Sequence, residues 1–290
     1  MKINTVLLIG GNGQLGKELV ALAPKKNITV IPVDLPEINI CKIETIEATF
    51  EKSNPDVIIN CAAYTAVDKA EDDKELAYQV NRDGAANIAT VAKNHSCRFV
   101  HVSTDYVFGD GFSEPINETA KTEPLNIYGA SKLAGEEEIL RIFPEGSIIA
   151  RTASLHGQYG ANFVHTMLKL FKEKESISVV SDQIMSPTWA GWLAKVLFEL
   201  ARQDCTGVVH TSSGQPVSWF EFAKAILEES KIDSKVQINP VSASEYPRAA
   251  KRSAYSVLNV DKLRKLTSND FVIGWREGLR GHLRDLNLIS

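Results

Sequence analysis

The chain has 290 residues, 44% of them hydrophobic, and its 32 basic and 36 acidic residues give a formal net charge of −4. A chain of this length can bury one large core or two smaller ones, and the balanced charge gives no indication of binding to nucleic acid or to an acidic membrane surface. The apolar run at the N-terminus is too short for a signal peptide, and no span of about 18 apolar residues predicts a membrane helix. We therefore expect a cytoplasmic globular protein.

In the first half, short apolar runs rich in β-branched residues alternate with longer amphipathic segments. The expected strands are 4–10, 28–34, 56–63, 98–104 and 147–152. The expected helices are 13–23, 42–53, 72–95 and a segment that begins near Tyr128. Strands that are apolar throughout and separated by helices are typical of a parallel sheet covered on both faces. The predicted fold is therefore a doubly wound α/β sheet of the Rossmann type.

After Arg151 the pattern changes to helices separated by short strands, with helices expected at about 162–174, 188–203, 218–230 and 275–286. We predict a dinucleotide-binding domain over 1–152 and a smaller, mainly substrate-binding domain over 153–290, some segments of which return to the first domain. The second domain is expected over the C-terminal ends of the strands, where open α/β sheets bind ligands.

A glycine-rich loop joins the first strand to the first helix, with Gly10, Gly11, Gly13 and Gly16. Glycines allow a tight turn and close approach of the backbone to a pyrophosphate, and the helix N-terminus offers free N–H groups. The alternative is a merely structural turn, but the position between strand and helix favours dinucleotide binding. Asp34, at the end of the second strand, suits the ribose hydroxyls of NADH better than a 2′-phosphate, unless it is only a turn residue.

Three side chains could carry reductive chemistry. Ser103 and Thr104 end the fourth strand, and Tyr128 lies four residues before Lys132, so both project from one face of a helix. Alone, this spacing is more typical of a solvated surface helix. Beside a nicotinamide, the ammonium would lower the pKa of the phenol and make Tyr128 an acid or base near neutrality. Thr104 would orient the substrate oxygen, and Lys132 would also reach the nicotinamide ribose.

These segments are recognisable together over nearly the whole chain. The markers are GGNGQLG (10–16), NCAAYTAVDKAE (60–71), STDYVFGDG (103–111), YGASKLAGE (128–136), ART (150–152), NFVHTML (162–168), VVSDQIMSPT (179–188) and SWFEFAKAI (218–226). The chain resembles the dTDP-4-dehydrorhamnose reductase family of the extended short-chain dehydrogenase/reductase superfamily.

The resemblance implies roles for residues at matching positions. It places the catalytic triad at Thr104, Tyr128 and Lys132, the last two also touching the cofactor. The other implied cofactor residues are Gly10, Gly13, Gln14, Leu15, Gly16, Asp34, Asn39, Ile40, Ala62, Ala63 and Tyr64. The implied substrate residues are Thr65, Val67, Ser103, Asp105, Tyr106, Asn162 and Arg252. Arg252, in the segment KRSAYSVLNVDKL, would face the nucleotide diphosphate, a role that suits a bidentate guanidinium, although a solvated loop charge is the alternative.

Three positions depart from the family pattern. Ala153 and Ser154 stand where a Ser-Trp pair usually follows Arg-Thr, Ser253 stands for a proline, and Asn39 replaces an aspartate near the adenine. The triad is unaffected. Loss of the tryptophan bears on which sugar fits, so a related deoxy- or amino-sugar is an alternative substrate.

The implied reaction is NADH- or NADPH-dependent reduction of the C4 ketone of a dTDP-4-keto-6-deoxyhexose, dTDP-4-dehydro-L-rhamnose to dTDP-L-rhamnose, for surface polysaccharide. One alternative is a nucleotide-sugar epimerase that retains its NAD. Another is a non-catalytic regulatory subunit, like the beta subunit of methionine adenosyltransferase, although the intact triad argues against it. The superfamily implies a homodimer.

No metal site is predicted. The cysteines (Cys41, Cys61, Cys97, Cys205) lie far apart without a C-x-x-C, and we expect Cys61 and Cys97 to be buried thiols. The histidines (His95, His101, His156, His165, His210, His282) lack ligand spacing and are interpreted as packing or surface residues. Some family members are reported with a divalent ion at a dimer contact, but no motif in this chain assigns ligands for one.

Overall fold

The computed structural model describes residues 2–290, apart from the side chain of Asn269. Within these residues a parallel sheet of six strands has the order β10-β5-β4-β3-β1-β2. The strands are β1 (Thr5–Ile9), β2 (Thr29–Val33), β3 (Val57–Asn60), β4 (Arg98–Thr104), β5 (Ser147–Thr152) and β10 (Gly207–His210). The predicted doubly wound parallel sheet is confirmed. The order reverses at β1, so β2 and β3 flank it on opposite sides.

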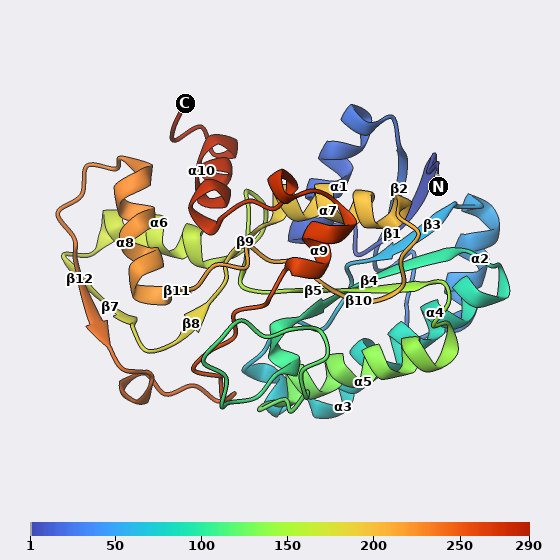
Figure 1. The fold of residues 1–290 in the computed structure, drawn as a ribbon, viewed down its shortest axis with the longest axis horizontal. Helices are drawn as coiled ribbons and strands as arrows, with labels where there is room; N and C mark the ends of the chain where they lie inside the picture. Colours follow the sequence, from blue (N-terminus) through green and yellow to red (C-terminus); the bar gives the residue numbers. More distant parts are fainter. Residues whose placement is uncertain (1) are drawn as a thin grey trace.

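Helices cover both faces of this sheet (Figure 1). On one face lie α1 (Gln14–Leu22) and α7 (Ala190–Arg202), and on the other lie α2 (Ile43–Ser53), α4 (Ala85–Asn94) and α5 (Ile127–Ile142). A short turn, η1 (Ala23–Lys26), follows α1, and α9 (Asp261–Leu266) packs beside β10. Although α7 and β10 come from the second half of the chain, they complete the sheet and its cover.

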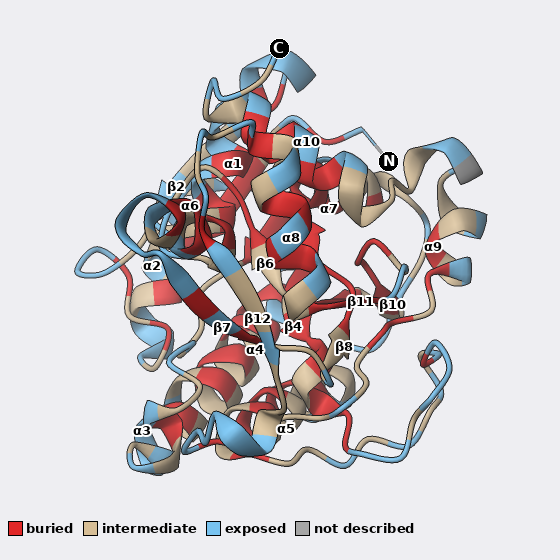
Figure 2. Cartoon of the chain, turned by 90° about the vertical axis from the view of Figure 1, so that its left-hand side faces the viewer, coloured by how far each residue is buried: buried red, intermediate tan, exposed pale blue. Residues whose placement is uncertain are grey.

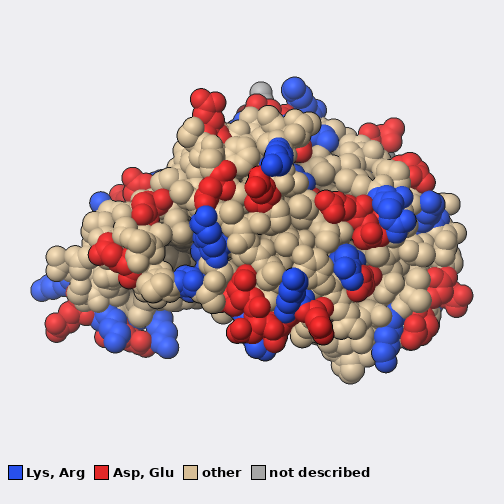
Figure 3. Space-filling model, turned by 90° about the horizontal axis from the view of Figure 1, so that it is seen from below, with Lys and Arg blue, Asp and Glu red and all other residues tan. Residues whose placement is uncertain are grey.

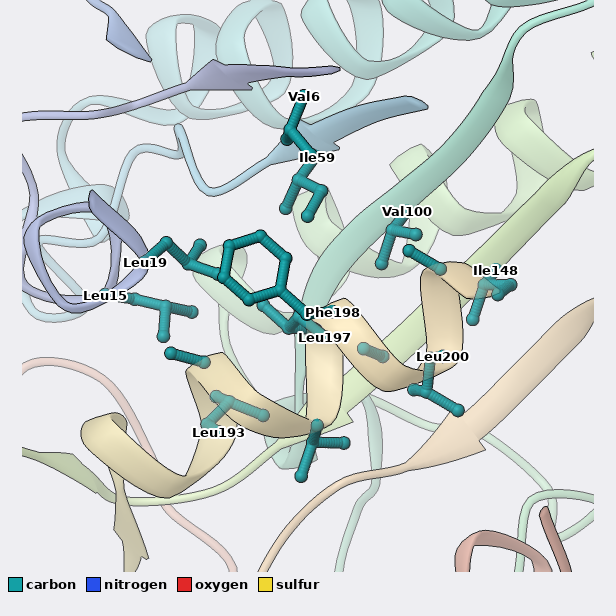
Figure 4. Close-up of a cluster of buried hydrophobic side chains, with 14 of the residues drawn as sticks. Val6, Leu15, Leu19, Ile59, Val100, Ile148, Leu193, Leu197, Phe198 and Leu200 are labelled. Carbon is teal, nitrogen blue, oxygen red and sulfur yellow. The ribbon is translucent and has the colours of Figure 1, made fainter. Parts of the chain in front are cut away.

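The apolar face of α7 forms the core on its side of the sheet. Leu193, Leu197 and Phe198 point towards the strands and are almost fully buried, as Figure 4 shows. Seen from the end of the molecule in Figure 2, α7 is largely buried. Each large aliphatic side chain removed from water in this way stabilises the fold by about 1.5–3 kcal/mol. This burial attaches the second half of the chain to the first.

A smaller lobe is built from α6 (Phe163–Glu173), α8 (Trp219–Ser230) and α10 (Trp275–Asp285), with β7 (Ser176–Val180) paired in parallel with β12 (Gln237–Val241). A parallel pair, β6 (Leu155–His156) with β9 (Thr188–Trp189), lies between β5 and α7 of the sheet domain in the chain, and an antiparallel pair, β8 (Ile184–Met185) with β11 (Val217–Ser218), contributes Met185 and Val217 to the core of the lobe. The lobe also contains η5 (Ala243–Glu245), whereas η6 (Asn269–Phe271) precedes α10. On the face seen in Figure 3, basic and acidic side chains are interspersed.

The helix predicted over 72–95 is interrupted in the structure. It consists of α3 (Lys74–Tyr78), a π-helical segment η3 (Gln79–Gly84) and α4, and it follows the short turn η2 (Lys69–Glu71). The wider π turn directs Asn81 to tertiary partners: its side chain accepts from the Tyr64 N–H at 2.8 Å and donates to the Ser131 Oγ at 2.9 Å. The sequence period does not reveal such a bulge, because contacts far along the chain stabilise it.

A buried ion pair fixes α5 on the sheet. Arg151 of β5 and Glu136 of α5 are 4% and 1% exposed, and the Arg151 Nε lies 3.0 and 3.1 Å from the two carboxylate oxygens. The same guanidinium lies 5.1 Å from the centroid of the Phe108 ring. Removing one partner of a buried ion pair strongly destabilises a protein, because the remaining charge is left without solvent or a counter-ion.

Glu136→Gln should therefore lower the free energy of unfolding by about 3–5 kcal/mol, because Arg151 would stay buried and uncompensated. Chemical denaturation measures this change. The matched control is Glu137→Gln, at the exposed neighbouring position, which should change stability by less than about 0.5 kcal/mol. Equal effects of the two variants would contradict the assigned role of the pair.

Four histidines are almost fully buried: His101, His156, His210 and His282. The His156 and His282 Nδ1 atoms lie 3.1 Å apart, and the His282 Nε2 lies 3.4 Å from the His165 Nε2. Burial, reinforced by neighbouring positive charge, lowers the pKa of all four below the ordinary value of 6.5, and to about 3 for His210 and His282. These imidazoles are therefore neutral in the folded protein near neutral pH.

The buried histidines predict that stability falls on mild acidification. Below pH 6.5 the unfolded chain binds protons at these histidines that the folded chain does not, so the free energy of unfolding decreases as pH falls from 6.5 towards 3. Each such group contributes about 1.4 kcal/mol per pH unit in this window. Urea unfolding at a series of pH values measures the slope, which His282→Gln should reduce by about one group's share. An unchanged slope in that variant would contradict the prediction.

The described residues include no helix both long and apolar enough to cross a membrane.

Candidate active site

A cleft of about 820 Å³ lies across the C-terminal ends of β1, β3, β4 and β5. The structure brings together in it most of the residues singled out from the sequence. They are Gly10, Gly13, Gln14, Leu15, Gly16, Asp34, Asn39, Ile40, Ala62, Ala63, Tyr64, Thr65, Val67, Ser103, Thr104, Asp105, Tyr106, Tyr128 and Lys132. Parallel strands deliver their C-terminal ends to one edge of a sheet, which is why segments far apart in sequence meet there.

The loop after β1 leaves room for a ligand against the backbone. Gly10 has φ +83°, and a Cβ there would lie 2.5 Å from the Ala62 nitrogen. A Cβ on Gly16 would lie 2.2 Å from the Gly10 carbonyl oxygen, so only glycine lets α1 start this close to the turn. Gly13 stands at the N-cap of α1, so no side chain caps the helix. The cradle therefore offers backbone N–H groups and a partial positive charge, which suits the pyrophosphate of a dinucleotide.

The far end of the cleft lies beside β2. The Asp34 carboxylate accepts from the Asn12 N–H at 3.2 Å and from the Leu35 N–H at 2.9 Å. Leu35 and Leu76, which are 67% and 45% exposed, border the same end. The sequence did not point to these leucines, because a single apolar residue in a loop carries no pattern.

Helix α5 presents its first turn to the cleft. The Asn126 side chain caps it by accepting from the Gly129 N–H at 2.8 Å. A Cβ on Gly129 would lie 2.1 Å from the Tyr106 carbonyl oxygen, so the glycine allows close packing against η4 (Asp105–Val107). The Tyr106 and Tyr128 rings meet edge to face, with centroids 5.5 Å apart. These contacts place Tyr128 beside the end of β4, where Thr104 lies.

The Lys132 Nζ contacts residues of β4 and makes no hydrogen bond with the Tyr128 hydroxyl. The Lys132 side chain is 1% exposed, its Nζ donates to the Val102 carbonyl at 2.7 Å, and the His101 Nε2 lies 3.0 Å from the same Nζ. Burial lowers the pKa of Lys132 to about 8, partly offset by the negative charge of Glu136. The charge of this lysine therefore responds to pH near neutrality.

The expected lowering of the Tyr128 pKa is absent from the structure. The enclosure of the phenol raises its pKa above the ordinary value of 10.0; a hydrogen bond with Thr104 opposes the rise, and the charge of Asp105 reinforces it. The side chain keeps partial access to the cleft, so water moderates the shift. The sequence-based prediction concerned the site beside a nicotinamide and stays a prediction; in the free protein the Lys132 Nζ is turned to His101 and to a carbonyl. Tyr128 is consequently a protonated phenol at neutral pH.

A smaller cavity of about 40 Å³ adjoins the cleft, and Asp105, Tyr106 and Ser154 line both. Arg252 lines the smaller cavity and is paired with Asp68, with N–O distances of 3.0 and 2.9 Å. This pairing lowers the pKa of Asp68 to about 2. Arg252 is thus an ordered part of the cavity wall, with its charge partly neutralised in the free protein.

Asn162 lies at the edge of the cleft, although it does not line it. Its side chain caps α6 by accepting from the His165 N–H at 3.2 Å and donates to the Gln14 Oε1 at 3.2 Å. The cap position explains the orientation of Asn162, and the bond to Gln14 connects the small lobe to the glycine loop.

Sequence reasoning missed several residues of the two cavities. The small lobe contributes Gln183, Ile184, Met185 and Trp219 to the smaller cavity. Cys61 was expected to be buried but lines the cleft with partial exposure, whereas Cys97 is buried as predicted. His101 and Asn60, which lie behind Lys132, were likewise missed. Within residues 2–290, no group of three or more His, Cys, Asp or Glu side chains is arranged to hold a metal ion.

Comparison with known proteins identifies the family. Residues 4–288 match the family described as "RmlD substrate binding domain". The chain is 38% identical to a dTDP-4-dehydrorhamnose reductase of Aggregatibacter actinomycetemcomitans, covering 90% of this chain and 92% of the relative. It is 35% identical to a dTDP-4-keto-6-deoxy-D-glucose reductase of Streptomyces niveus, covering 89% and 90%.

A solved structure of dTDP-4-dehydrorhamnose reductase from Bacillus anthracis in complex with NADP is similar over 98% of this chain and 100% of that one, with 38% identity and a TM-score of 0.93. The family match and the relatives both extend over nearly the whole length. On these grounds the chain belongs to the dTDP-4-dehydrorhamnose reductase family.

Proposed function

We propose that this protein uses NADH or NADPH to reduce the C4 ketone of a dTDP-4-keto-6-deoxyhexose, with dTDP-4-dehydro-L-rhamnose as substrate and dTDP-L-rhamnose as product. The observation that carries the proposal is the meeting of Thr104, Tyr128 and Lys132 in the cleft that also holds the glycine cradle. A ketone reduction needs a hydride donor, a proton donor and a group that orients the carbonyl oxygen. The cleft supplies sites for all three.

The glycine cradle of Gly10, Gly13 and Gly16 would hold the pyrophosphate, and Asp34 would accept the adenosine ribose hydroxyls. When bound, the nicotinamide supplies the hydride. Gln14, Leu15, Asn39, Ile40, Ala62, Ala63 and Tyr64, which line the same cleft, would complete the cofactor site. The volume of the cleft suits such an extended ligand.

Tyr128 would donate its proton to the oxygen that becomes the hydroxyl. The resting phenol holds its proton at neutral pH and can therefore give it to the oxygen as negative charge develops there. The Thr104 hydroxyl would hydrogen-bond the same oxygen and fix its orientation. Lys132, one turn further along α5, would stabilise the negative charge that Tyr128 acquires.

The rest of the substrate would extend into the smaller cavity. Arg252 would pair with the diphosphate, exchanging part of its contact with Asp68 for phosphate oxygens. Six residues would contact the sugar. Thr65, Val67, Ser103, Asp105 and Tyr106 line the cleft, and Asn162 lies at its edge.

A second substrate is favoured by a specific feature of the cleft. The residues after Thr152 are the small Ala153 and Ser154, which line the cleft between the cofactor and nucleotide ends. Small side chains there leave space beside the sugar ring. The reductase of Streptomyces niveus is named for dTDP-4-keto-6-deoxy-D-glucose, so this sugar, which differs from the rhamnose precursor in configuration at C3 and C5, is the alternative substrate.

One assay tests the proposal and separates the two sugars. The dTDP-4-keto-6-deoxy-D-glucose made by an upstream dehydratase is offered alone, or after conversion by an epimerase to dTDP-4-keto-L-rhamnose. Oxidation of NADH or NADPH that depends on both protein and keto-sugar supports the proposal, and the faster sugar is the substrate. No oxidation with either sugar, by a protein shown to bind the cofactor, would contradict it.

Tyr128→Phe should lower kcat by about 10²–10⁴-fold, because the proton donor is removed while the ring remains. Stopped-flow or steady-state NADH oxidation measures the loss, and binding of the cofactor should change little. The matched control is Tyr246→Phe at an exposed tyrosine of the small lobe. Turnover near wild type in Tyr128→Phe would exclude Tyr128 as the donor.

We further propose that Asp34 makes NADH the preferred cofactor, whereas the Bacillus anthracis relative is known in complex with NADP. Asp34→Ala should lower kcat/KM for NADH by about 10–100-fold, the value of hydrogen bonds to a charged group, and should narrow the gap to NADPH. The control is Glu37→Ala, at an exposed acid of the same loop. An unchanged NADH-to-NADPH ratio in Asp34→Ala would contradict this assignment.

The homodimer and the divalent ion implied by the family resemblance stay predictions.

A further inference from the structure

Three polar side chains form a buried chain behind the catalytic helix. Asn60 ends β3, His101 lies in β4 and Lys132 projects from α5, and each is 1% exposed. The Asn60 Nδ2 lies 3.0 Å from the His101 Nδ1, and the His101 Nε2 lies 3.0 Å from the Lys132 Nζ. The Lys132 Nζ also donates to the Val102 carbonyl at 2.7 Å. No water is needed to complete this sequence of contacts.

A backbone donor fixes the direction of these hydrogen bonds. The Ala62 N–H, which can only donate, binds the Asn60 Oδ1 at 3.0 Å. The other end of the amide is therefore the NH₂ group, which donates to the His101 Nδ1. An imidazole nitrogen that accepts a hydrogen bond carries no proton, so in the neutral ring the proton is on Nε2. That N–H faces the lysine nitrogen.

An ammonium group cannot accept this bond. A charged Lys132 has only donors, whereas a neutral amine has one lone pair for the His101 Nε2–H and still donates to Val102. To charge Lys132, His101 must move its proton to Nδ1, and two donors, Nδ1–H and the Asn60 NH₂, then face each other. Rotating the amide only moves the conflict to Ala62. Each charged arrangement therefore leaves one buried hydrogen bond unmade.

We propose that His101, oriented by Asn60, is a positioning residue for the reaction: it holds Lys132 in place and favours its neutral amine in the free protein. Burial lowers the pKa of Lys132 to about 8, so one hydrogen bond decides its charge near neutral pH. Burial and the charge of Lys132 lower the pKa of His101 well below its ordinary value, which agrees with a neutral ring.

The other ionisable groups near Lys132 do not by themselves set its protonation state. Glu136, one turn along α5, is paired with Arg151. Cys61, after β3, has its pKa raised to about 12 by burial and is a neutral thiol. Tyr128 is a phenol in the free protein, and no charged group but Lys132 shifts the pKa of His101.

The consequence for turnover rests on the proposed function. Before reaction, a phenol and an amine are together neutral; after Tyr128 has given its proton to the substrate oxygen, a phenolate and an ammonium are again neutral. The proton gained by Lys132 comes from solvent and equals the one that ketone reduction consumes. The buried pair thus avoids a net charge at both stages, which a low-dielectric site favours.

The first test needs neither cofactor nor substrate, so it is independent of the proposed function. Two-bond ¹H–¹⁵N correlation spectra of the histidine-labelled free protein distinguish the tautomers of neutral imidazoles. We expect an unprotonated Nδ1 and a protonated Nε2 for His101 at neutral pH. A proton on Nδ1 would overturn the proposal. Assignment uses the signal that disappears in His101→Gln.

Asn60→Asp tests the role of the amide with almost no change of shape. A carboxylate oxygen in place of the NH₂ group accepts a bond instead of donating one, so the His101 Nδ1 should become protonated and Nε2 free to accept from an ammonium. An Nδ1 that stays unprotonated in this variant would show that Asn60 does not set the tautomer, and would overturn the proposal.

His101→Gln tests the effect on Lys132, because its amide carbonyl can accept from an ammonium without conflict. The pKa of Lys132, followed by ¹³Cε chemical shift in the lysine-labelled protein, should rise by about one to two units. His210→Gln, at a buried histidine of β10 that does not contact Lys132, is the control and should leave this pKa unchanged.

In the active enzyme, His101→Gln should move the limb of the kcat profile that reports the titration of Lys132 to higher pH by the same amount. A merely structural role would lower kcat equally at every pH. An unchanged pKa of Lys132 in a folded His101→Gln protein, or an unshifted pH profile of kcat, would overturn the proposal. If the wild-type protein did not turn over the keto-sugar at all, that result would contradict the proposed function only.

Discussion

The docking of α5 on the sheet is the constraint on which the site depends. Its buried face is unusual for a helix of a globular protein, because it carries Ser131, Lys132 and Glu136 together with two glycines. Apolar burial alone would not hold such a face. Instead, each buried polar side chain of the helix has a partner. Glu136 pairs with Arg151, and Lys132 contacts His101 and a backbone carbonyl. Ser131 accepts a hydrogen bond from Asn81.

The two glycines make this matching geometrically achievable. A Cβ on Gly129 or Gly135 would lie 2.1 Å from a backbone oxygen, of Tyr106 and of Asn81 respectively. The helix therefore packs nearly backbone to backbone at both places, and its polar side chains reach partners in β4 and β5. Because buried polar groups are stable only when their partners are in place, this interface permits one register and one orientation of Tyr128.

The second half of the chain contributes both to the core of the sheet domain and to the wall of the smaller cavity. Its α7 and β10 complete the core under the sheet, so the small lobe is anchored by apolar burial rather than by a flexible linker. The lobe in turn provides Met185 and Trp219 to the wall of the smaller cavity. The smaller cavity therefore exists only where the two parts of the chain meet.

Much of the fold follows from the sequence itself. Apolar runs separated by amphipathic segments predicted the parallel sheet, since strands buried on both faces are mostly apolar. The glycine loop and Asp34 could be singled out as parts of one cleft because a tight turn and a strand end are local features. The spacing of Tyr128 and Lys132 likewise predicted that both project from one face of a helix.

The local sequence pattern does not reveal the contacts between segments that are distant in the chain. The π segment at 79–84 depends on Tyr64 and Ser131, and the pKa of Tyr128 follows from its enclosure rather than from a nearby lysine. Lys132 projects from α5, whereas His101 and Asn60, which form the buried chain behind it, come from β4 and β3. Neither residue was singled out for the site from the sequence. The sequence by itself determined which groups the protein has for its chemistry. The tertiary structure decided their protonation and their partners, because burial and hydrogen bonding act through space and not along the chain.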